Sequence, residues 1–404
     1  MKIRSSALII SAAIVLLAAC PLGYAQTDEV GNVHTVLLTE GRDRLDNAHI
    51  VFTQEKKGRV AFIGGSITAS PGWRDLTCEM LKQRFPETEF DFINAGVGGT
   101  NSTLGAMHLE NDVFSKGRVD LLFVEFAVND GDSPSRGSRL DRAMEGIVRH
   151  ARTINPNIDI VIQYFMQQGM QEAVNQGKFP SSVEYHERVA EHYRIPAINM
   201  TAVVTKMLNE KSLAWDEFSR DSCHPTETGH KLYAEQIHQL FDVMWDAPLP
   251  VDARVASHPI PQPLDMQNYE HGRFVEVNEA KILNGWELVK GWETQKTCNY
   301  SGAVDVLTAT EPGAELELTF EGTLVGINAI AGMDAGTLEY AIDDGPVNSQ
   351  DLFDHYCEQF HRPVCHVLAE DLPPGKHILR LKMAVKANEK SEGHAARIRC
   401  FVVN

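Results

Sequence analysis

Two short segments of the sequence carry side chains that together could catalyse acyl transfer. Ser66 lies in a Gly-Gly-Ser-Ile-Thr segment (residues 64–68) that directly follows a brief apolar run. Asp221 precedes His224 by three residues. At this spacing the carboxylate can accept a hydrogen bond from one imidazole nitrogen, which leaves the other nitrogen free to take a serine proton. Each segment alone also fits a helix cap or a turn.

Two further segments could stabilise the negative charge that develops on the carbonyl oxygen during acyl transfer. Residues 94–99 read Asn-Ala-Gly-Val-Gly-Gly, and residues 126–130 contain Asn129. A glycine amide and an asparagine side chain are suitable donors for an oxyanion hole. All four segments follow expected strands or precede an expected helix, so together they specify one site.

The four segments resemble the sequence blocks of the SGNH (GDSL-like) hydrolase superfamily. The resemblance implies that Ser66 is the nucleophile and that the Asp-x-x-His segment, with Asp221 and His224, completes a catalytic triad. It also implies an oxyanion hole formed by the amides of Ser66 and Gly99 and the side chain of Asn129, with Gly98 as the alternative to Gly99. We expect no cofactor and no metal in such a site.

Two positions depart from the pattern of the superfamily. Gly65 stands in place of the Asp of the GDS form, and Ala127 stands in place of the glycine that usually lies two places before the Asn. Neither change removes a catalytic atom. The resemblance spans roughly Arg59 to Trp245 and does not cover the C-terminal half.

The elements that must position these residues can be inferred from the apolar patterning. Between Arg59 and Asp246, helical patterns alternate with brief apolar runs at Val60–Ile63, Phe90–Ile93, Leu121–Val128, Ile158–Phe165 and Ile195–Met200. Such runs are typical of parallel strands that are covered on both faces, and functional residues are expected at their carboxyl ends. The resemblance implies a flavodoxin-like three-layer α/β/α sandwich with a parallel sheet.

The second half of the chain has a different pattern. Residues 247–263 contain five prolines and no apolar periodicity, which predicts a Pro-rich linker between the catalytic domain at 59–246 and an accessory domain at 264–404. Alternating apolar residues and Gly, Asp and Pro turns predict that this accessory domain is an all-β sandwich. Residues 26–58 form a lead-in segment.

The N-terminus resembles an export signal. Lys2 and Arg4 precede an apolar run from Ala7 to Ala19 that is too short to span a membrane. Two outcomes remain open: Cys20 becomes the lipidated first residue of a lipoprotein, or cleavage near Ala25 releases a soluble protein. Either way we expect a periplasmic, secreted or outer-membrane-anchored bacterial protein.

The net charge limits the classes of substrate, and the cysteine content bears on possible disulfides. The 37 Lys and Arg residues against 55 Asp and Glu give the 404-residue chain a net charge of -18, which argues against nucleic acid and favours a neutral substrate. Beyond Cys20, two cysteines lie in the first half and four in the second, which permits disulfides within each domain, including Cys78 to Cys223. Buried free thiols are the alternative.

Three residues near the site have open roles. Trp73 is a candidate wall against a sugar ring or acyl chain, or else packs its helix against the sheet. Arg74 is a candidate contact for an acidic substituent, or else forms a surface ion pair. Glu125 lies within an apolar run, and we expect it to be buried and bonded to nearby backbone or to Arg74.

The leading hypothesis is an exported serine esterase that removes O-acetyl groups from polysaccharides or oligosaccharides through an acyl-enzyme on Ser66. It rests on an SGNH domain joined to a β-sandwich, a layout similar to that of several bacterial carbohydrate esterases. The alternatives are a lipid-directed short-chain esterase or lysophospholipase, and a non-catalytic glycan-binding protein. The oligomeric state is not predicted.

Overall fold

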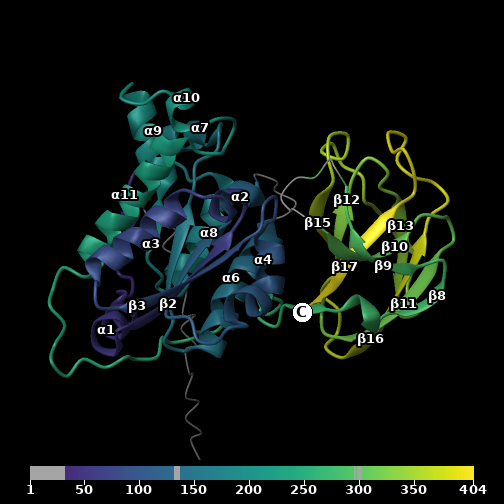
Figure 1. Ribbon diagram of the computed structural model, residues 1–404, viewed down its shortest axis with the longest axis horizontal. Helices are drawn as coiled ribbons and strands as arrows, with labels where there is room; N and C mark the ends of the chain where they lie inside the picture. The colour runs from purple at the N-terminus through teal and green to yellow at the C-terminus, as the bar shows by residue number, and fades with distance from the viewer. Residues whose placement is uncertain (1–31, 132–136, 295–296, 298–302) are drawn as a thin grey trace, which may run out of the picture.

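The computed structural model describes residues 32–131, 137–294, 297 and 303–404 (Figure 1). Its first half is built on a six-stranded sheet in the order β1-β6-β5-β4-β2-β3. The strands are β1 (Leu37–Leu38), β2 (Lys57–Gly64), β3 (Glu89–Gly96), β4 (Leu121–Glu125), β5 (Asp159–Tyr164) and β6 (Ala197–Asn199). The five strands from β2 to β6 pair in parallel, and β1 pairs antiparallel with β6. Counted from β2, the parallel order is the flavodoxin-like 2-1-3-4-5.

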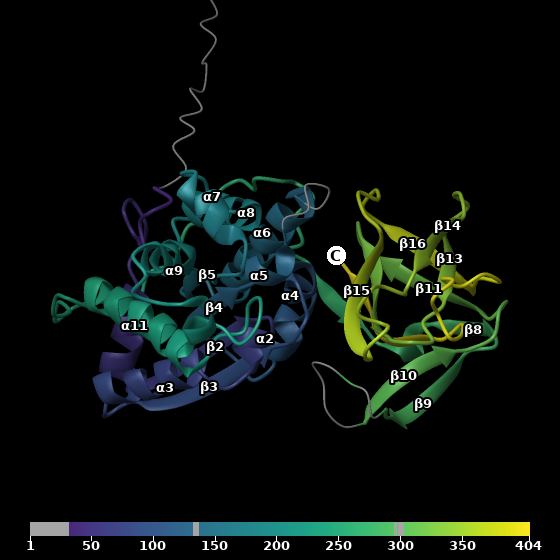
Figure 2. The same ribbon diagram turned by 90° about the horizontal axis from the view of Figure 1, so that it is seen from above.

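Helices cover both faces of this sheet. They are α1 (Asp46–Ile50), α2 (Ser66–Ala69), α3 (Trp73–Arg84), α4 (Ser102–Leu109), α5 (Ala127–Asp130), α6 (Gly137–Ile154), α7 (Met170–Asn175), α8 (Ser181–His192), α9 (Met200–Asn209), α10 (Trp215–Phe218) and α11 (Glu227–Met244). Figure 2 shows α3 and α11 on one side of the sheet and α4, α6 and α8 on the other.

Alternate residues of the central strand β2 pack into different apolar cores. Ala61 and Ile63 belong to the core beneath α4, α6 and α8, whereas Val60 and Phe62 belong to the core beneath α3 and α11. This alternation explains why the strand reads as a continuous apolar run, since neither of its faces meets solvent. The predicted three-layer α/β/α fold is confirmed.

The second half is a β-sandwich, as its alternating pattern predicts. One sheet has the order β15-β12-β17-β10-β9 with β7 beside β17, and the other has the order β14-β13-β16-β11-β8. The strands are β7 (Arg273–Val275), β8 (Lys281–Asn284), β9 (Glu287–Trp292), β10 (Val304–Ala309), β11 (Glu315–Glu321), β12 (Val325–Ala331), β13 (Thr337–Ile342), β14 (Asn348–Asp351), β15 (Arg362–Ala369), β16 (Lys376–Met383) and β17 (Ala396–Val403). A third apolar core lies between the two sheets.

The sandwich packs directly on the α/β half, on the side of α4 and α6 (Figure 2). Leu324 and Val402 of the sandwich half are buried in the same apolar core as those two helices. Around them, Arg142 of α6 forms ion pairs with Asp265 (2.7 Å) and with Asp371 (3.0 Å). The contact between the two halves therefore combines apolar packing with ion pairs.

The signal segment, Cys20 and Cys298 lie outside the described residues. Among the residues that are described, no helix is long and apolar enough to cross a bilayer. The cysteines in this part of the chain, which are Cys78, Cys223, Cys357, Cys365 and Cys400, are all free thiols. The bridge that the sequence permits between Cys78 and Cys223 is not formed: Cys78 is buried on α3, whereas the Cys223 sulfur lies beside His224.

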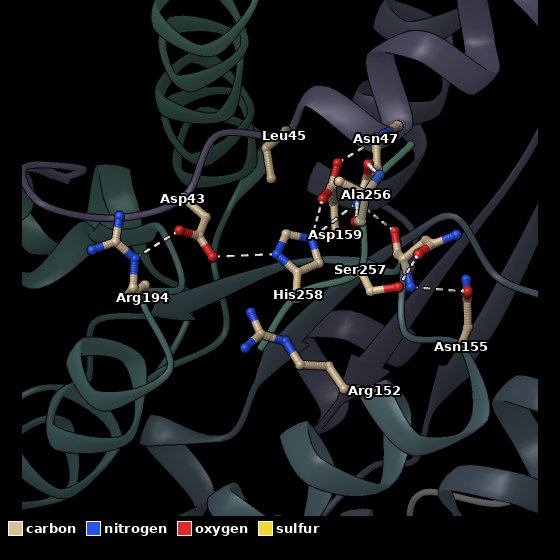
Figure 3. A network of polar contacts seen from close by, with 12 residues as sticks. Asp43, Leu45, Asn47, Arg152, Asn155, Asp159, Arg194, Ala256, Ser257 and His258 are labelled. Atoms are coloured by element: carbon tan, nitrogen blue, oxygen red, sulfur yellow. Dashed lines mark hydrogen bonds and ion pairs between the residues drawn. The ribbon is translucent and has the colours of Figure 1, made fainter. Parts of the chain in front are cut away.

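The Pro-rich segment at 247–263 packs along the α/β half and is hydrogen-bonded to it (Figure 3). His258 places its Nε2 2.8 Å from Asp159 and its Nδ1 3.2 Å from Asp43. Asn47 exchanges two hydrogen bonds with the backbone of Ala256, each 2.8 Å long. Arg152 donates to the carbonyl oxygen of Pro259. The absence of apolar periodicity, which predicts a linker here, gives no sign that the segment is held by such contacts.

His258 compensates the burial of the Asp159 carboxylate. Burial raises the pKa of Asp159, and the hydrogen bonds from His258 and from the Ala48 amide oppose that rise. We expect His258→Ala to leave the carboxylate short of a partner and to lower the free energy of unfolding by about 1–3 kcal/mol, measured by urea denaturation. Ser257→Ala, which removes only an exposed bond to Asn157, is the control and should change it by less than about 0.5 kcal/mol. Equal effects of the two variants would contradict the role of His258.

Candidate active site

The hydroxyl of Ser66 lies at the carboxyl end of the central strand β2. Gly64 ends the strand, Gly65 is extended, and Ser66 begins the short helix α2. The Ser66 Oγ is 2.8 Å from His224 Nε2, although the two residues are 158 positions apart in the chain. The structure thus brings together the two segments that the sequence singled out.

Asp221 orients the imidazole of His224. Its Oδ2 lies 2.8 Å from His224 Nδ1, and its Oδ1 accepts hydrogen bonds from the amides of Cys223 and His224. Partial burial opposes the charge of Asp221, but the bonds from these amides and from the imidazole outweigh it and lower the pKa to about 2. The carboxylate is therefore ionised at neutral pH, and it favours the tautomer of His224 whose Nδ1 carries the proton.

The Asp-x-x-His loop is held from several sides. The Ser219 hydroxyl and the Arg220 amide both donate to the carbonyl oxygen of His224, each at 2.9 Å. The Trp215 indole donates to the carbonyl oxygen of Asp221, also at 2.9 Å. These contacts fix the loop between α10 and α11 and so hold the imidazole toward Ser66.

Asn129 lies next to the nucleophile turn. It sits on α5, directly after β4, the neighbour of β2 in the sheet. A Cβ atom added to Gly65 would collide with Asn129 Oδ1. This contact explains the first departure from the GDS pattern, because in this arrangement any side chain at position 65 would push Asn129 away.

The glycine segment lies on the other side of the same turn. The amide of Val97 continues the ladder by donating to the carbonyl oxygen of Gly64 (2.9 Å), and a Cβ on Gly96 would lie 2.5 Å from the amide nitrogen of Ala69 in α2. Gly99 has a φ of 71°, a left-handed conformation that favours glycine. Gly99 lies in the loop between β3 and α4, three residues after the glycine that packs against α2.

A buried carboxylate links the glycine segment to the Asn129 segment. Asp130 Oδ1 accepts from the amide of Ser102 at the start of α4 (2.9 Å), and its Oδ2 lies 2.6 Å from His186 Nε2. Both side chains of the Asp130 and His186 pair are fully buried. No local pattern indicates this pair, because His186 lies 56 residues from Asp130 and belongs to α8, outside the four segments described above.

Glu125, the last residue of β4, lies directly beneath the nucleophile turn. Its Oε2 accepts from the Thr68 hydroxyl at 2.9 Å, and the amide of Gly65 also donates to the carboxylate. Burial raises the pKa of Glu125 to about 7, against the effect of these two bonds. Burial and a backbone partner were expected; Arg74, the other expected partner, instead forms an ion pair with Asp75.

Trp73 does not line a substrate site. Its side chain is fully buried and packs by its edges against Phe62 and Phe165, at ring distances of 5.5 and 5.4 Å. The alternative, packing of α3 against the sheet, holds. Arg74 is largely buried and donates to the carbonyl oxygen of Thr68 as well as pairing with Asp75, which matches the ion-pair alternative.

An open pocket of about 480 Å³ adjoins the His224 loop. It lies between the start of α3 and the start of α11, and it is lined by Pro71, Gly72, Asp75, Leu76, Glu79, Arg220, Pro225, Thr226, Glu227, His230 and Lys231. Burial lowers the pKa of His230, whose Nδ1 accepts from the Trp73 amide, so this imidazole stays neutral near pH 7. The pocket therefore lies beside the loop that carries Asp221 and His224.

Comparison with known proteins finds one matching family model and several similar structures. Residues 62–232 match the model of the GDSL-like Lipase/Acylhydrolase family. No curated protein matches the sequence. Two crystal structures of a two-domain esterase active on acetylated mannans, one of them with mannopentaose, are similar over 93% of this chain and 97% of theirs. Both have a TM-score of 0.72, at 22% and 21% identity. This likeness shows that the two-domain fold is shared.

A further similar structure is an acetyl xylan esterase of Geobacillus stearothermophilus, which is 18% identical. The match covers 46% of this chain and 96% of the esterase chain, and the TM-score is 0.38.

The raised pKa of Glu125 makes stability depend on pH. Between the ordinary value of 4.5 and about 7, the folded state keeps a proton that the unfolded chain releases, so stability falls as pH rises through this window. The loss amounts to at most about 3 kcal/mol. We expect Glu125→Gln to remove this loss, measured as the difference in free energy of unfolding between about pH 5 and about pH 8.

Glu89→Gln, at an exposed position at the start of β3, is the control and should keep the pH dependence of the wild type. If Glu125→Gln keeps that dependence as well, the proton is not held by Glu125.

Proposed function

We propose that this chain, whose residues 62–232 match the model of the GDSL-like lipase/acylhydrolase family, is a carboxylic ester hydrolase that removes acetyl groups from polysaccharides through an acyl-enzyme on Ser66. One observation carries the proposal. A continuous hydrogen-bonded chain runs from Ser66 Oγ to His224 Nε2 and from His224 Nδ1 to Asp221 Oδ2, each contact 2.8 Å long.

The proposed reaction begins with proton transfer. His224 Nε2 takes the proton of Ser66 as the serine oxygen attacks the ester carbonyl carbon. The negative charge on the carbonyl oxygen is stabilised by the amides of Ser66 and Gly99 and by the side chain of Asn129. His224 then protonates the leaving alcohol oxygen, which leaves an acetyl group on Ser66.

Water completes the reaction by the reverse sequence. His224 deprotonates a water molecule, the hydroxide attacks the acetyl carbonyl, and Ser66 recovers its proton as acetate leaves. Asp221 keeps its charge throughout and stabilises the imidazolium that forms in each half. Its low pKa suits this role, because the carboxylate does not itself take up the proton.

Several features support a carbohydrate substrate. The net charge of -18 disfavours polyanionic partners and suits a neutral polymer. The two-domain fold is shared with an esterase whose substrates are acetylated mannans. The β-sandwich is packed against the catalytic half, so a polymer that contacts both could be bound at two places. Acetylated mannan is therefore the first substrate to test.

We also propose that the chain is exported. The proposal rests on the Lys2 and Arg4 charges before the apolar run from Ala7 to Ala19. Lipidation of Cys20 and cleavage near Ala25 are distinguished by the mass of the mature N-terminal peptide.

Substitution of the nucleophile tests the mechanism. We expect Ser66→Ala to lower the turnover of an acetyl ester by several orders of magnitude, because no other group replaces the attacking oxygen. Thermal unfolding should remain as in the wild type, since the hydroxyl is not part of the core. Turnover within a few-fold of the wild type would remove Ser66 from the nucleophile role.

The contact between Gly65 and Asn129 allows a sharper test of the oxyanion hole. Asn129→Ala should lower turnover by about 10²–10³, the usual effect of losing one oxyanion donor. Gly65→Ala should lower turnover as well, because its Cβ would displace Asn129. If both act through the same donor, the double variant should be no slower than Asn129→Ala alone. Additive losses would show that Gly65 matters for another reason.

The substrate class is tested by acetate release from acetylated mannan, xylan, pectin and algal polysaccharides, with Ser66→Ala as the blank. We expect release from at least one neutral polymer. On nitrophenyl esters, activity should fall as the acyl chain grows beyond acetyl. A preference for long acyl chains, without acetate release from any polymer, would instead support a lipid-directed esterase.

A further inference from the structure

The thiol of Cys223 is a reactive group in the active-site loop that the proposed reaction does not use. Cys223 lies between Asp221 and His224 in the chain, is partly exposed and forms no disulfide. Its Sγ is 3.6 Å from Nδ1 of His224, on the same side of the ring as the Asp221 carboxylate. A sulfur, a nitrogen and an oxygen donor therefore surround one point next to the imidazole.

The spacing of these donors suits a single metal ion. The ligand atoms of Asp221, Cys223 and His224 all lie within 4.8 Å of one another. Zinc binds sulfur at about 2.3 Å and nitrogen or oxygen at about 2.0–2.2 Å, so donors around a tetrahedral ion lie about 3–4 Å apart. Small side-chain movements would complete the geometry, and the partial exposure of the loop leaves a fourth position for water. Soft thiolate and imidazole donors select zinc and similar thiophilic cations over Mg²⁺ or Ca²⁺.

We propose that Asp221, Cys223 and His224 form an inhibitory site for a thiophilic divalent cation such as Zn²⁺. The inference goes beyond the proposed function, and only its inhibitory consequence rests on the catalytic role of His224. Nothing is oxidised or reduced. A metal–sulfur bond replaces the S–H bond of Cys223, and that proton passes to solvent.

Inhibition follows from the tautomer of His224. A cation on Nδ1 takes the place of the proton that this nitrogen donates to Asp221. The neutral ring then carries its single proton on Nε2, which faces Ser66 Oγ at 2.8 Å. In that form Nε2 has no lone pair with which to accept the serine proton, and the cation also takes up the Asp221 oxygen that orients the ring. The metal-bound site therefore lacks a general base.

Cation binding is measured first, without reference to activity. Cd²⁺ is added to the full-length wild type, to Cys223→Ser and to Cys78→Ser, and the ultraviolet charge-transfer absorption of a cadmium–thiolate bond is recorded. Cys78, buried on α3, is the matched control. We expect the band in the wild type and in Cys78→Ser and its loss in Cys223→Ser. Absence of the band in the wild type, or its persistence in Cys223→Ser, overturns the site.

The inhibitory effect is measured with Zn²⁺ in an acetyl ester assay. Zn²⁺ should inhibit the wild type reversibly, with recovery on addition of EDTA. Cys223→Ser should keep its basal activity and need at least about 10-fold more Zn²⁺ for half inhibition, the lower end of the usual effect of removing a partner from a metal site. Equal sensitivity of the two proteins overturns the proposal. If no protein hydrolyses any ester, the proposed function fails while the cadmium band still decides the site.

A measurement on the wild type alone guards against a misfolded variant. Alkylation of Cys223 by iodoacetamide, read by peptide mass spectrometry, should slow by at least about 10-fold when Zn²⁺ is present. Cys365, which is not part of the site, should be labelled at the same rate with and without Zn²⁺. Unchanged labelling of Cys223 means that its thiol does not bind the ion and only packs against the core.

Discussion

The parallel pairing of β2 with β4 is the constraint on which the site depends. Gly64 lies opposite Glu125 at the carboxyl ends of these strands, so the turns that follow must pass one another within a few ångströms. A Cβ at Gly64 would lie 2.6 Å from the carbonyl oxygen of Glu125, and one at Gly65 would meet Asn129. Two successive glycines therefore let Ser66 approach Asn129. The pair of strands is also the point where the strand order reverses, which is where open α/β sheets place their ligands.

Buried carboxylates hold the candidate catalytic segments in place. Glu125 accepts from Thr68 and Gly65 of the turn that carries Ser66, and Asp130 accepts from Ser102 of the glycine segment. Burying a carboxylate costs free energy unless it is hydrogen-bonded. Each of these carboxylates therefore favours the one arrangement in which its partner segment donates hydrogen bonds to it. The same logic applies at the opposite end of the sheet, where Asp159 holds His258 of the linker. In each case a buried carboxylate binds a segment that is distant in sequence.

Local patterning was sufficient to predict the fold because each element is defined by its own residues. The brief apolar runs correspond to β2 to β6, because strands buried on both faces are apolar throughout. The alternating half corresponds to the sandwich, because strands buried on one face alternate apolar and polar residues. The residues that carry chemistry were recognisable because they lie in short segments. Their supports were not, since the partner of Asp130 is His186 and the partner of the buried Asp159 is His258, and no local pattern encodes such pairs.

Two roles that the sequence leaves open are excluded for a common physical reason. Trp73 follows Ser66 by a few residues, but α3 turns its indole into the core beneath Phe62, so proximity in sequence gives no proximity to the site. An even number of cysteines permits a bridge between Cys78 and Cys223, but a disulfide requires two sulfur atoms that point at each other. The structure aims the Cys223 sulfur at His224 instead. That orientation is set by the same hydrogen bonds from residues 223 and 224 to Asp221 that position the imidazole. The geometry by which His224 would act as the proposed base therefore also brings a thiol to its Nδ1, so a cation bound there would compete with the proposed reaction for the same nitrogen.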